Sequence, residues 1–465
     1  MRDEGRPPSG ALPRQSLEHE LGKPRSEWSV DDLVGIYSSR NVQIVSLMHV
    51  GGDGWLKTLD FVPQSVGHLR HIVQGGERAD GSSLFPQSGI MPNSSDIVLK
   101  PRVGSAFLDP FASLPTLVLM CGHRGPDGTP LPQSPDTILR RACEMLKQKT
   151  GCDLWALGEV EYFLGKRRDE SDIYGADDRG YHASSPFVFG EALRRRALAI
   201  LADIGVRVKY GHSEVGYIEA REANGVIWEQ HEIELSLSPL PDAAEATLLT
   251  QWILRNLAHE RGMRCSTDPM MMEGHAGNGL HFHLAPMKGA DPVEIRDESG
   301  NLTEPARWLI GGIVQLGAAL MAFGNRAEGS FARLAQAKEA PNKFIWGEFD
   351  RSALIRLPAV PMDEGGKPVA PRTIEFRLPD GSALPHLLLA GAALVMIRGR
   401  ETEHLDDLLE RTYSGTTTEQ GGGAEHVPRN FTEVADALIR HRKALELGNV
   451  FPAVLIDKVV AGLRS

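Results

Sequence analysis

The chain has 465 residues, of which 41% are hydrophobic and 24% are charged, and its formal net charge is −11 at pH 7. These values are typical of a globular protein, and the length allows two domains with a large core. The negative charge, with no basic run to offset it, excludes a general binder of nucleic acid or of anionic membranes. It suits a protein that gathers carboxylates around divalent metal ions.

The N-terminal segment and the cysteines indicate the compartment. The four cysteines lack C-x-x-C spacing and are too few to cross-link a chain of this length, which favours reduced thiols. Residues Met1 to about Ser26 are rich in Pro, Gly, Arg and Glu, which argues against a signal peptide. No later run of about eighteen apolar residues suggests a membrane span. We therefore predict a cytoplasmic protein with no nucleic-acid or membrane partner.

A small β-rich part is expected first. A helix is predicted over Val30–Ser38, with Ser29 or Asp31 as its cap. Gly51-Gly52-Asp53-Gly54 favours a hairpin turn between two strands. The strands of this part are expected over residues 42–50, 55–62, 96–101 and 116–121. Frequent Gly, Pro and Ser around residues 130–136 indicate a domain boundary.

The remaining chain alternates predicted helices with short strands. Apolar residues recur at helical spacing in residues 136–150, 189–204, 243–261 and 306–323. The predicted organisation is a polar arm (1–28), a small domain (29–132) and a large domain (133–465).

One stretch, residues 274–284, organises the large domain. Glycines open it, and Leu280, Phe282 and Leu284 then alternate with His281 and His283, which is the period-two pattern of a strand with one apolar and one polar face. Both imidazoles therefore point the same way. Beside a glycine-rich loop they suggest a metal or phosphate site, although solvated histidines are the alternative for a single strand.

The same alternation recurs in other strands. The polar faces carry Glu159 and Glu161, Glu232, Arg356, and Glu375 with Arg377. A sheet surface in water would also carry Lys, Thr and Ser, whereas these faces hold almost only Glu, His and Arg. We therefore predict an α+β fold in which a curved antiparallel sheet is backed by helices and lines a cavity with its charged face.

The side chains of this face favour one kind of chemistry. Glutamates with a histidine suit Mg²⁺ or Mn²⁺ better than structural zinc. Arginines bind phosphate or carboxylate through two hydrogen bonds. Carboxylate-bound metal facing arginines is typical of phosphoryl transfer from a nucleotide. The chain has no Walker or protein-kinase motif, so a nucleotide would be held in another way.

With these strands located, the chain resembles glutamine synthetase from about Val30 to its C-terminus. The matching segments are Asp80-Gly81-Ser82-Ser83, Glu159-Val160-Glu161, His212-Ser213-Glu214-Val215, Gln230-His231-Glu232, 277–283, Arg333-Leu334, Glu339-Ala340-Pro341, Asp350-Arg351-Ser352, 355–358 and 374–380. Their number and order argue against chance similarity. The resemblance implies that the small domain, residues 29–132, is β-grasp-like.

The resemblance also implies a role for each matching residue of the large domain. One metal ion would bind between Glu161, Glu214 and Glu232, and a second between Glu159, His281 and Glu375. The phosphates of ATP would contact Arg351, Arg356 and His283. The amino-acid substrate would contact Arg333, Arg377 and the backbone of Gly277.

The acceptor end would be shared between subunits. Asp80 and Ser83 from a neighbouring subunit would bind ammonium together with Tyr181 and Glu214. Glu339 would lie on a flap that closes the site and helps to deprotonate ammonium. Asp80, Glu339 and Arg351 are thus the implied catalytic residues. Such sharing requires a ring, and family similarity implies a dodecamer of two hexameric rings.

The implied activity is an ATP-dependent ligase, with two or three Mg²⁺ or Mn²⁺ ions, that forms glutamine from L-glutamate and ammonia through γ-glutamyl phosphate. Two alternatives remain: a γ-glutamylamide ligase that uses an alkylamine or polyamine, and a non-catalytic structural or regulatory oligomer. Asp80 and Ser83 favour ammonia. Ala276, where the family commonly has Asn, and a predicted hairpin extension over residues 216–229 favour the amine. All six implied metal ligands are present, which argues against the non-catalytic alternative.

Overall fold

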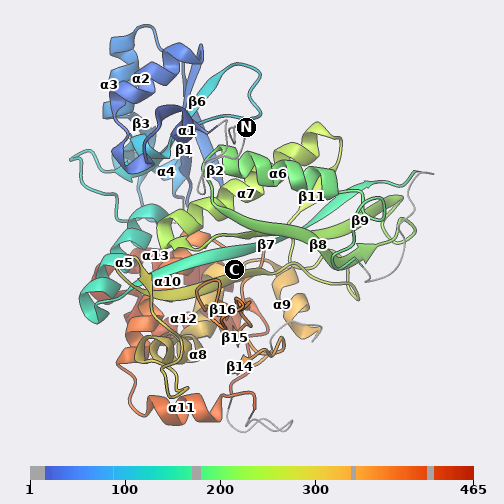
Figure 1. The fold of residues 1–465 in the computed structure, drawn as a ribbon. Coiled ribbons are helices and arrows are strands. Elements are labelled where there is room, and N and C mark those ends of the chain that lie inside the picture. Colours follow the sequence, from blue (N-terminus) through green and yellow to red (C-terminus); the bar gives the residue numbers. More distant parts are fainter. Residues whose placement is uncertain (1–15, 87, 170–179, 337–341, 416–423) are drawn as a thin grey trace.

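The computed structural model describes residues 16–86, 88–169, 180–336, 342–415 and 424–465. The fold contains two sheets with helices packed around and between them (Figure 1). The smaller sheet is formed by the N-terminal part of the chain, and the larger one by the residues that follow α5 (Pro135–Thr150). The expected α+β fold with a curved sheet is confirmed.

The small sheet has the strand order β2-β1-β6-β4-β3, with β5 on β6. Its strands are β1 (Ile44–Val50), β2 (Leu56–Phe61), β3 (Glu77–Asp80), β4 (Asp96–Pro101), β5 (Phe107–Leu108) and β6 (Thr116–Arg124). The pair β1 and β6 is parallel and the others are antiparallel. The helices of this part are α1 (Leu17–Leu21), η1 (Arg25–Glu27), α2 (Val30–Ser39), α3 (Val66–Gly75), α4 (Gly81–Leu84), η2 (Pro92–Ser94) and η3 (Val103–Ser105).

The predicted elements of this part are found with their ends shifted by at most three residues, and the strand predicted over residues 96–101 matches β4 without a shift. Ser29 caps α2 in a capping box with Asp32, because each side chain accepts a hydrogen bond from the other residue's backbone N–H. Helix α3 was not predicted. Residues 16–28, assigned to the polar arm, are partly folded, since Leu17 and Trp28 are buried in the core of the small sheet.

The large sheet has the order β14-β15-β16-β12-β7-β9-β8, with β10 and β11 on β7 and β13 on β12. Its strands are β7 (Asp153–Arg167), β8 (Val208–Ile218), β9 (Val226–Leu235), β10 (Ser238–Pro239), β11 (Arg264–Ser266), β12 (Leu280–Lys288), β13 (Asp291–Pro292), β14 (Trp346–Glu348), β15 (Ile355–Leu357) and β16 (Ile374–Phe376). Every pair is antiparallel except β14 with β15. One parallel edge pair thus departs from the predicted antiparallel sheet.

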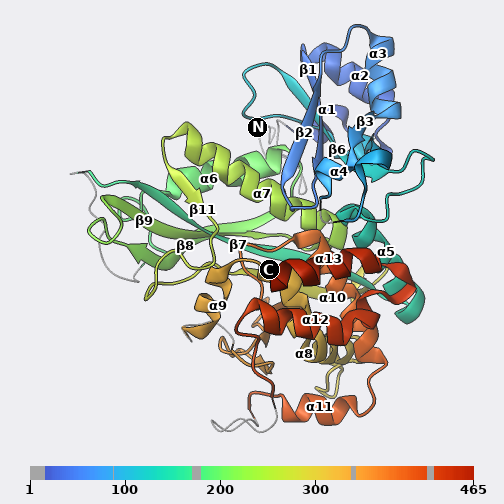
Figure 2. The ribbon, with the colours of Figure 1, turned by 180° about the vertical axis from the view of Figure 1, so that it is seen from behind.

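Helices pack around the large sheet in two groups. Figures 1 and 2 show α6 and α7 between the small sheet and the long strands β7 to β9, whereas α8, α10 and α12 pack together on the other side of β7. The helices are α6 (Glu191–Asp203), α7 (Leu240–Glu260), α8 (Glu304–Gly324), α9 (Glu328–Ala335), α10 (Pro385–Arg400), α11 (Leu405–Arg411), α12 (Phe431–Leu445), η4 (Leu447–Asn449) and α13 (Ala453–Arg464). Leu280, Phe282 and Leu284 of β12 are buried in this core, as their alternation predicts.

Helix α8 is long and apolar enough to cross a membrane, contrary to the expectation that no such segment exists. However, 72% of its most apolar window is buried inside the fold. Its main packing partner is α10, which is buried along almost its whole length. The apolar surface of α8 is therefore accounted for by the core.

The predicted extension between Glu214 and Glu232 forms the outer half of the β8–β9 hairpin. Its loop ends at Asn224 and Gly225, both with positive φ (55° and 82°), as the Asn-Gly turn signal predicts. On the other side of the loop, the pairing register of β8 shifts between Ser213 and Tyr217. Glu214 lies in this irregular stretch, and bulges of this kind often re-aim side chains beside active sites.

Candidate active site

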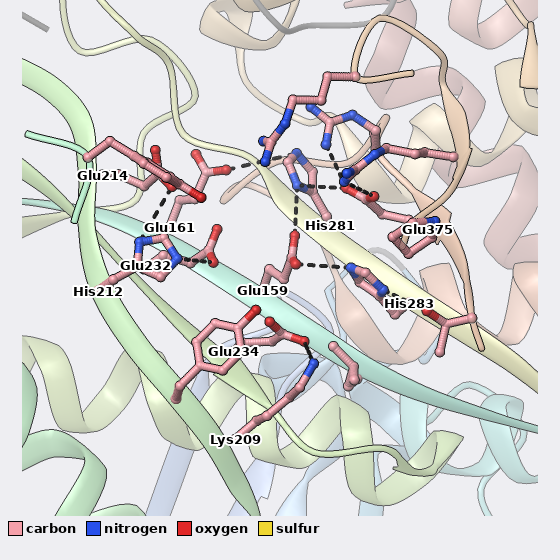
Figure 3. A pocket seen from close by; sticks show the side chains of 18 of the residues that line it. Glu159, Glu161, Lys209, His212, Glu214, Glu232, Glu234, His281, His283 and Glu375 are labelled. Atoms are coloured by element: carbon pink, nitrogen blue, oxygen red, sulfur yellow. Dashed lines mark hydrogen bonds and ion pairs between the residues drawn. The ribbon is translucent and has the colours of Figure 1, made fainter. Parts of the chain in front are cut away.

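A cavity of about 950 Å³ lies over the charged face of the large sheet. Figure 3 shows carboxylates and imidazoles from several strands pointing toward one another in it. Every predicted site residue of the large domain that the structure describes lines this cavity: Glu159, Glu161, Tyr181, Glu214, Glu232, Gly277, His281, His283, Arg333, Arg351, Arg356, Glu375 and Arg377.

Strand register explains why residues far apart in sequence meet here. His281 on β12 pairs with Glu159 on β7, and Glu161 pairs with Glu232 on β9. His212 on β8 pairs with Glu232 in turn. Side chains directly opposite each other share one face of a sheet. These pairs therefore bring carboxylates and imidazoles from four strands onto the same face.

One group of metal-ligating atoms is formed by Glu159, His283 and Glu375, whose ligand atoms lie within 4.8 Å of one another. His281, which we expected in this group, is also close, with Nδ1 3.1 Å from Glu159 Oε2 and 3.7 Å from Glu375 Oε1. His283 Nε2 is 2.9 Å from Glu159 Oε1, and its Nδ1 is 2.8 Å from the hydroxyl of Thr373. Both histidines of the strand therefore reach the same carboxylate.

A second group is formed by His212, Glu214 and Glu232. His212 Nε2 lies 3.2 Å from Glu232 Oε1, and its Nδ1 lies 3.6 Å from Glu214 Oε1. Glu161, which we expected here, instead accepts hydrogen bonds from the backbone N–H of Gly279 at 2.7 Å and from the side chain of Gln230 at 3.1 Å. His212 belongs to the matching segment His212-Ser213-Glu214-Val215, but the resemblance did not imply that it is a ligand. Its position two residues before Glu214 was the available signal.

The cavity shifts the pKa values of two of its carboxylates in opposite directions. Burial, then repulsion from Glu159, Glu161, Glu214 and Glu375, holds the pKa of Glu232 well above its usual range. Burial also acts to raise the pKa of Glu159, but the charges and hydrogen bonds of His283 and His281 outweigh it and hold this pKa well below its usual range.

The pKa of His283 responds to the same neighbour. Burial acts to lower it, but the charge and hydrogen bond of Glu159 raise it to about 9. Glu159 and His283 therefore each favour the charged form of the other.

The residues fit divalent metal ions. Among the residues that the structure describes, no lysine or arginine forms an ion pair with Glu161 or Glu232, although both are largely buried. Buried carboxylates that repel one another are costly unless a cation or a proton offsets them. Oxygen donors with one imidazole per group match Mg²⁺ or Mn²⁺, which supports the predicted metal chemistry.

The arginines lie at one side of these groups. Arg377 Nη1 and Arg356 Nη1 donate to the two oxygens of Glu375, at 2.6 and 2.9 Å. Arg333 is buried and donates to the backbone carbonyls of residues 377–379. Arg351 lines the cavity as well. Positive charge is therefore available for an anionic substrate beside the acidic groups.

The predicted acceptor residues are not all in this cavity. Asp80 caps α4 and accepts hydrogen bonds from Ser82 and Ser83, at 2.7 and 2.6 Å, and neither Asp80 nor Ser83 lines the cavity of its own chain. Hydrogen bonds from Ser83, Ser82 and Ser95 lower the pKa of Asp80. Tyr181 does line it, and its ring stacks on His182 at 4.3 Å. Glu339 lies outside the described residues.

Sequence reasoning missed a further charge pair in the cavity. Lys209 Nζ is 2.5 Å from Glu234 Oε1, and Figure 3 shows this pair on the far side of Glu159 from His281. Glu234 is directly opposite Glu159 in the sheet. The signal was present, because Glu234 follows Glu232 by two residues and so shares its face.

Comparisons with known proteins agree with this geometry. A family model described as "Glutamine synthetase, catalytic domain" matches residues 132–461. The glutamine synthetase of Neisseria gonorrhoeae is 29% identical over 83% of this chain and 85% of its own length, and that of Vibrio cholerae is 25% identical over 93% and 95%. Glutamine synthetase of Plasmodium falciparum has a similar fold, with a TM-score of 0.77, 21% identity and coverage of 94% and 95%. A GmaS–ADP complex has a TM-score of 0.71, 19% identity and coverage of 93% and 94%.

Proposed function

Because the chain belongs to the glutamine synthetase family, whose members are ATP- and metal-dependent ligases, we propose that it forms glutamine from L-glutamate and ammonia through γ-glutamyl phosphate. The observation that carries the proposal is the cavity in which two carboxylate and imidazole groups face four arginines. That arrangement suits transfer of a phosphoryl group to a carboxylate, where two anions must be brought together.

We assign the ions to the two groups of donors. Glu159, His281 and Glu375, with His283 close by, would hold one divalent ion, and Glu214 and Glu232, with Glu161 or His212, would hold another. When bound, these ions supply positive charge to the phosphates and to the leaving oxygen of ATP. The residues Arg351 and Arg356 would bind the phosphates.

The remaining residues would handle the acid and the amine. Arg333 and Arg377 would hold the acid substrate, with the backbone of Gly277 near its amino group. Once the carboxylate has accepted the terminal phosphoryl group, ammonia displaces phosphate from the acyl phosphate, and Glu214 with Tyr181 would orient ammonia at this step. Water must be kept from the acyl phosphate during this step, because this intermediate hydrolyses readily.

We also propose that the site is completed by a neighbouring subunit. Members of this family are usually oligomeric, and Asp80 lies on the small sheet away from its own cavity. A ring, with a dodecamer of two hexamers as the family form, would bring Asp80 and Ser83 of one subunit to the cavity of the next. A monomer that elutes with full activity would contradict this arrangement.

A second candidate is a γ-glutamylamide ligase with an alkylamine or polyamine as acceptor. Two observations favour it: Ala276 lines the cavity where an asparagine is common in the family, and the hairpin extension contacts the neighbouring His275 through Glu222. In this case the metals, the arginines and the acyl phosphate keep the same roles.

The experiment compares acceptors directly. Phosphate release from ATP with Mg²⁺ and L-glutamate is measured with ammonium, methylamine, ethanolamine and putrescine, and the products are identified by mass. We expect ammonium to give the highest kcat/KM. Turnover with an organic amine but not with ammonium would overturn glutamine formation in favour of the second candidate. No turnover with any acceptor would overturn both.

A further inference from the structure

The loop before β12, residues 274–279, is held at its two ends by different parts of the fold. At its C-terminal end, Gln230 donates to the carbonyl of Gly277 and to Asn278 Oδ1, both at 3.0 Å. Asn278 donates in turn to the carbonyl of Asp268 at 2.9 Å. These bonds join this end of the loop to β9 and to the segment after β11.

The N-terminal end of the loop is held by one backbone hydrogen bond, from the N–H of His275 to the carbonyl of Met272 at 3.3 Å, and by contacts to side chains. His275 Nε2 lies 3.1 Å from Glu222 Oε2, at the tip of the β8–β9 hairpin. The amide of Gln336, oriented to satisfy both its ends, donates to the carbonyl of His275 at 3.1 Å and accepts from the N–H of Gly274 at 3.0 Å. The hairpin extension, which distinguishes this chain from the usual family pattern, thus contacts a loop of the active site.

The loop that carries His275 reaches Arg333 through its glycines, Gly277 and Gly279. The loop residues His275, Ala276 and Gly277 all line the cavity. A Cβ added to Gly277 would be 3.0 Å from Cγ of Arg333 and 2.4 Å from the carbonyl oxygen of Pro269. The loop therefore rests directly on the arginine that we propose as the anchor of the acid substrate, and a displacement of His275 would move the cavity wall there.

The contact between Glu222 and His275 adds little to overall stability. The side chain of Glu222 is 36% exposed and that of His275 is 13% exposed. Ion pairs exposed to this degree contribute about 0 to 1 kcal/mol, because water screens them. Its main consequence is thus the position of the loop rather than the stability of the fold.

We propose that Glu222 is a positioning residue that holds His275, and that this link sets the affinity of the cavity for the acid substrate. The inference rests on the proposed function, because it assigns the acid to the Arg333 end. With the link intact, the loop stays against Arg333 and the binding site for an α-amino acid is preformed, so less binding energy is spent on ordering it. Without it, the loop loses its contact with the hairpin, and the imidazole of His275 loses its hydrogen bond to Glu222.

The hairpin itself offers a matched control. Glu219 lies in the same tip, and its Oε1 is 2.5 Å from Nη1 of Arg168, but neither residue lines the cavity. Glu222→Ala and Glu219→Ala therefore each remove one carboxylate and one ion pair from the hairpin. Only the first change releases a residue of the active site.

The test measures initial rates of the full-length protein with Mg²⁺ and ATP while L-glutamate is varied. We expect Glu222→Ala to raise the KM for glutamate about tenfold with kcat within about twofold, and Glu219→Ala to change KM less than twofold. Glu222→Gln, which still accepts from the imidazole, should restore most of the affinity. The double variant Glu222→Ala/His275→Ala should have a KM no higher than that of either single variant, because each substitution alone already breaks the same contact.

Equal effects of Glu222→Ala and Glu219→Ala would overturn the proposal, as would an unchanged KM. Should the wild type not turn over glutamate, the proposed function fails separately, and the link is then tested by hydrogen exchange in the unliganded protein. Faster exchange of residues 274–277 in Glu222→Ala than in Glu219→Ala supports the link, and equal exchange overturns it.

Discussion

Two groups of buried titratable residues in this protein are built in opposite ways. In the cavity, carboxylates outnumber their local partners: Glu161 contacts an amide and a backbone N–H, and Glu232 contacts His212. At the contact between the small sheet and helices α5, α7 and α10, the charges are matched. There Arg102 pairs with Asp136 at 3.4 Å and with Glu245, and Arg140 Nε pairs with Asp136 at 3.0 Å, so two arginines face two carboxylates.

The histidines of the two groups show the same contrast. His283 lies between carboxylates, and the charge of Glu159 raises its pKa to about 9 against the effect of burial. At the sheet contact, His123 bonds to Ser134 at 2.8 Å and to His49 at 3.0 Å, and burial lowers the pKa of His123 to about 3 and that of His49 to about 4. The first group needs added cations, whereas the second is complete without them. A buried group whose charges are balanced within the protein indicates a structural contact. A buried group with unbalanced charge indicates a binding site.

The largest expected effect comes from removing one carboxylate of each group. Glu232→Gln should lower metal-dependent turnover by about 10³-fold or more, because a metal ligand is lost. The same change should raise the melting temperature in the absence of metal, because it removes a carboxyl whose ionised form is disfavoured by burial and by its acidic neighbours. Activity and stability are measured by phosphate release and by thermal unfolding in a chelator.

The matched change at the sheet contact is Asp136→Asn, which removes a carboxylate that pairs with Arg102 and Arg140. These two arginines lower the pKa of Asp136 against the effect of burial, so its charge stabilises the folded state at pH 7. We expect the change to destabilise the protein by about 1 to 3 kcal/mol and to leave kcat within about twofold. Stability loss in Glu232→Gln as large as in Asp136→Asn, without metal, would show that the two groups are alike and would break the comparison.

The second prediction concerns pH. His386 is buried at the start of α10, neither ring nitrogen has a hydrogen-bond partner among the described residues, and burial lowers its pKa from 6.5 to about 4. Below pH 6.5 the unfolded chain therefore binds a proton that the folded chain does not, so stability falls as pH falls. Between pH 6.5 and pH 5 each such histidine costs about 2 kcal/mol.

The variant His386→Leu should remove its share of this loss and be at least as stable at pH 7, since an unpartnered polar ring is replaced by an apolar side chain. Urea unfolding at pH 7 and pH 5 measures the difference. An unchanged pH dependence in His386→Leu would mean that this ring does not titrate as its burial requires.

Local patterns in the sequence predicted the faces of the strands but not their neighbours. Alternation in β12 placed His281 and His283 in the cavity, because side-chain direction is set within a strand. Which imidazole lies nearest Glu375 depends on cross-strand register and side-chain rotamers, which alternation alone does not give. The assignment of His283 to ATP came from the resemblance, and in the structure His283 also shares Glu159 with His281.

Other differences have similar causes. His212 and Glu234 carried the period-two signal, but the family motifs drew attention to their neighbours Glu214 and Glu232 instead. Helix α3 was missed because its apolar residues Leu69, Ile72 and Val73 are interspersed with histidines and an arginine in a short segment. The place of Asp80 relative to a cavity depends on a second subunit, so one chain does not determine it.

The smallest expected effect is a rise in melting temperature on adding Mg²⁺, and it distinguishes the cavity from the sheet contact most directly. An ion that binds only the folded state stabilises it by about 2.7 kcal/mol when its concentration is 100 times its Kd, which is a shift of a few degrees in melting temperature for a chain of this size. We therefore expect Mg²⁺ to raise the melting temperature of the wild type and of His386→Leu equally, since the sheet contact has no place for it. Glu232→Gln should lose much of this shift, because one of the two donor groups no longer holds an ion. An equal shift in all three proteins would mean that Mg²⁺ binds outside the His212, Glu214 and Glu232 group, and the excess of carboxylates there would then need another explanation.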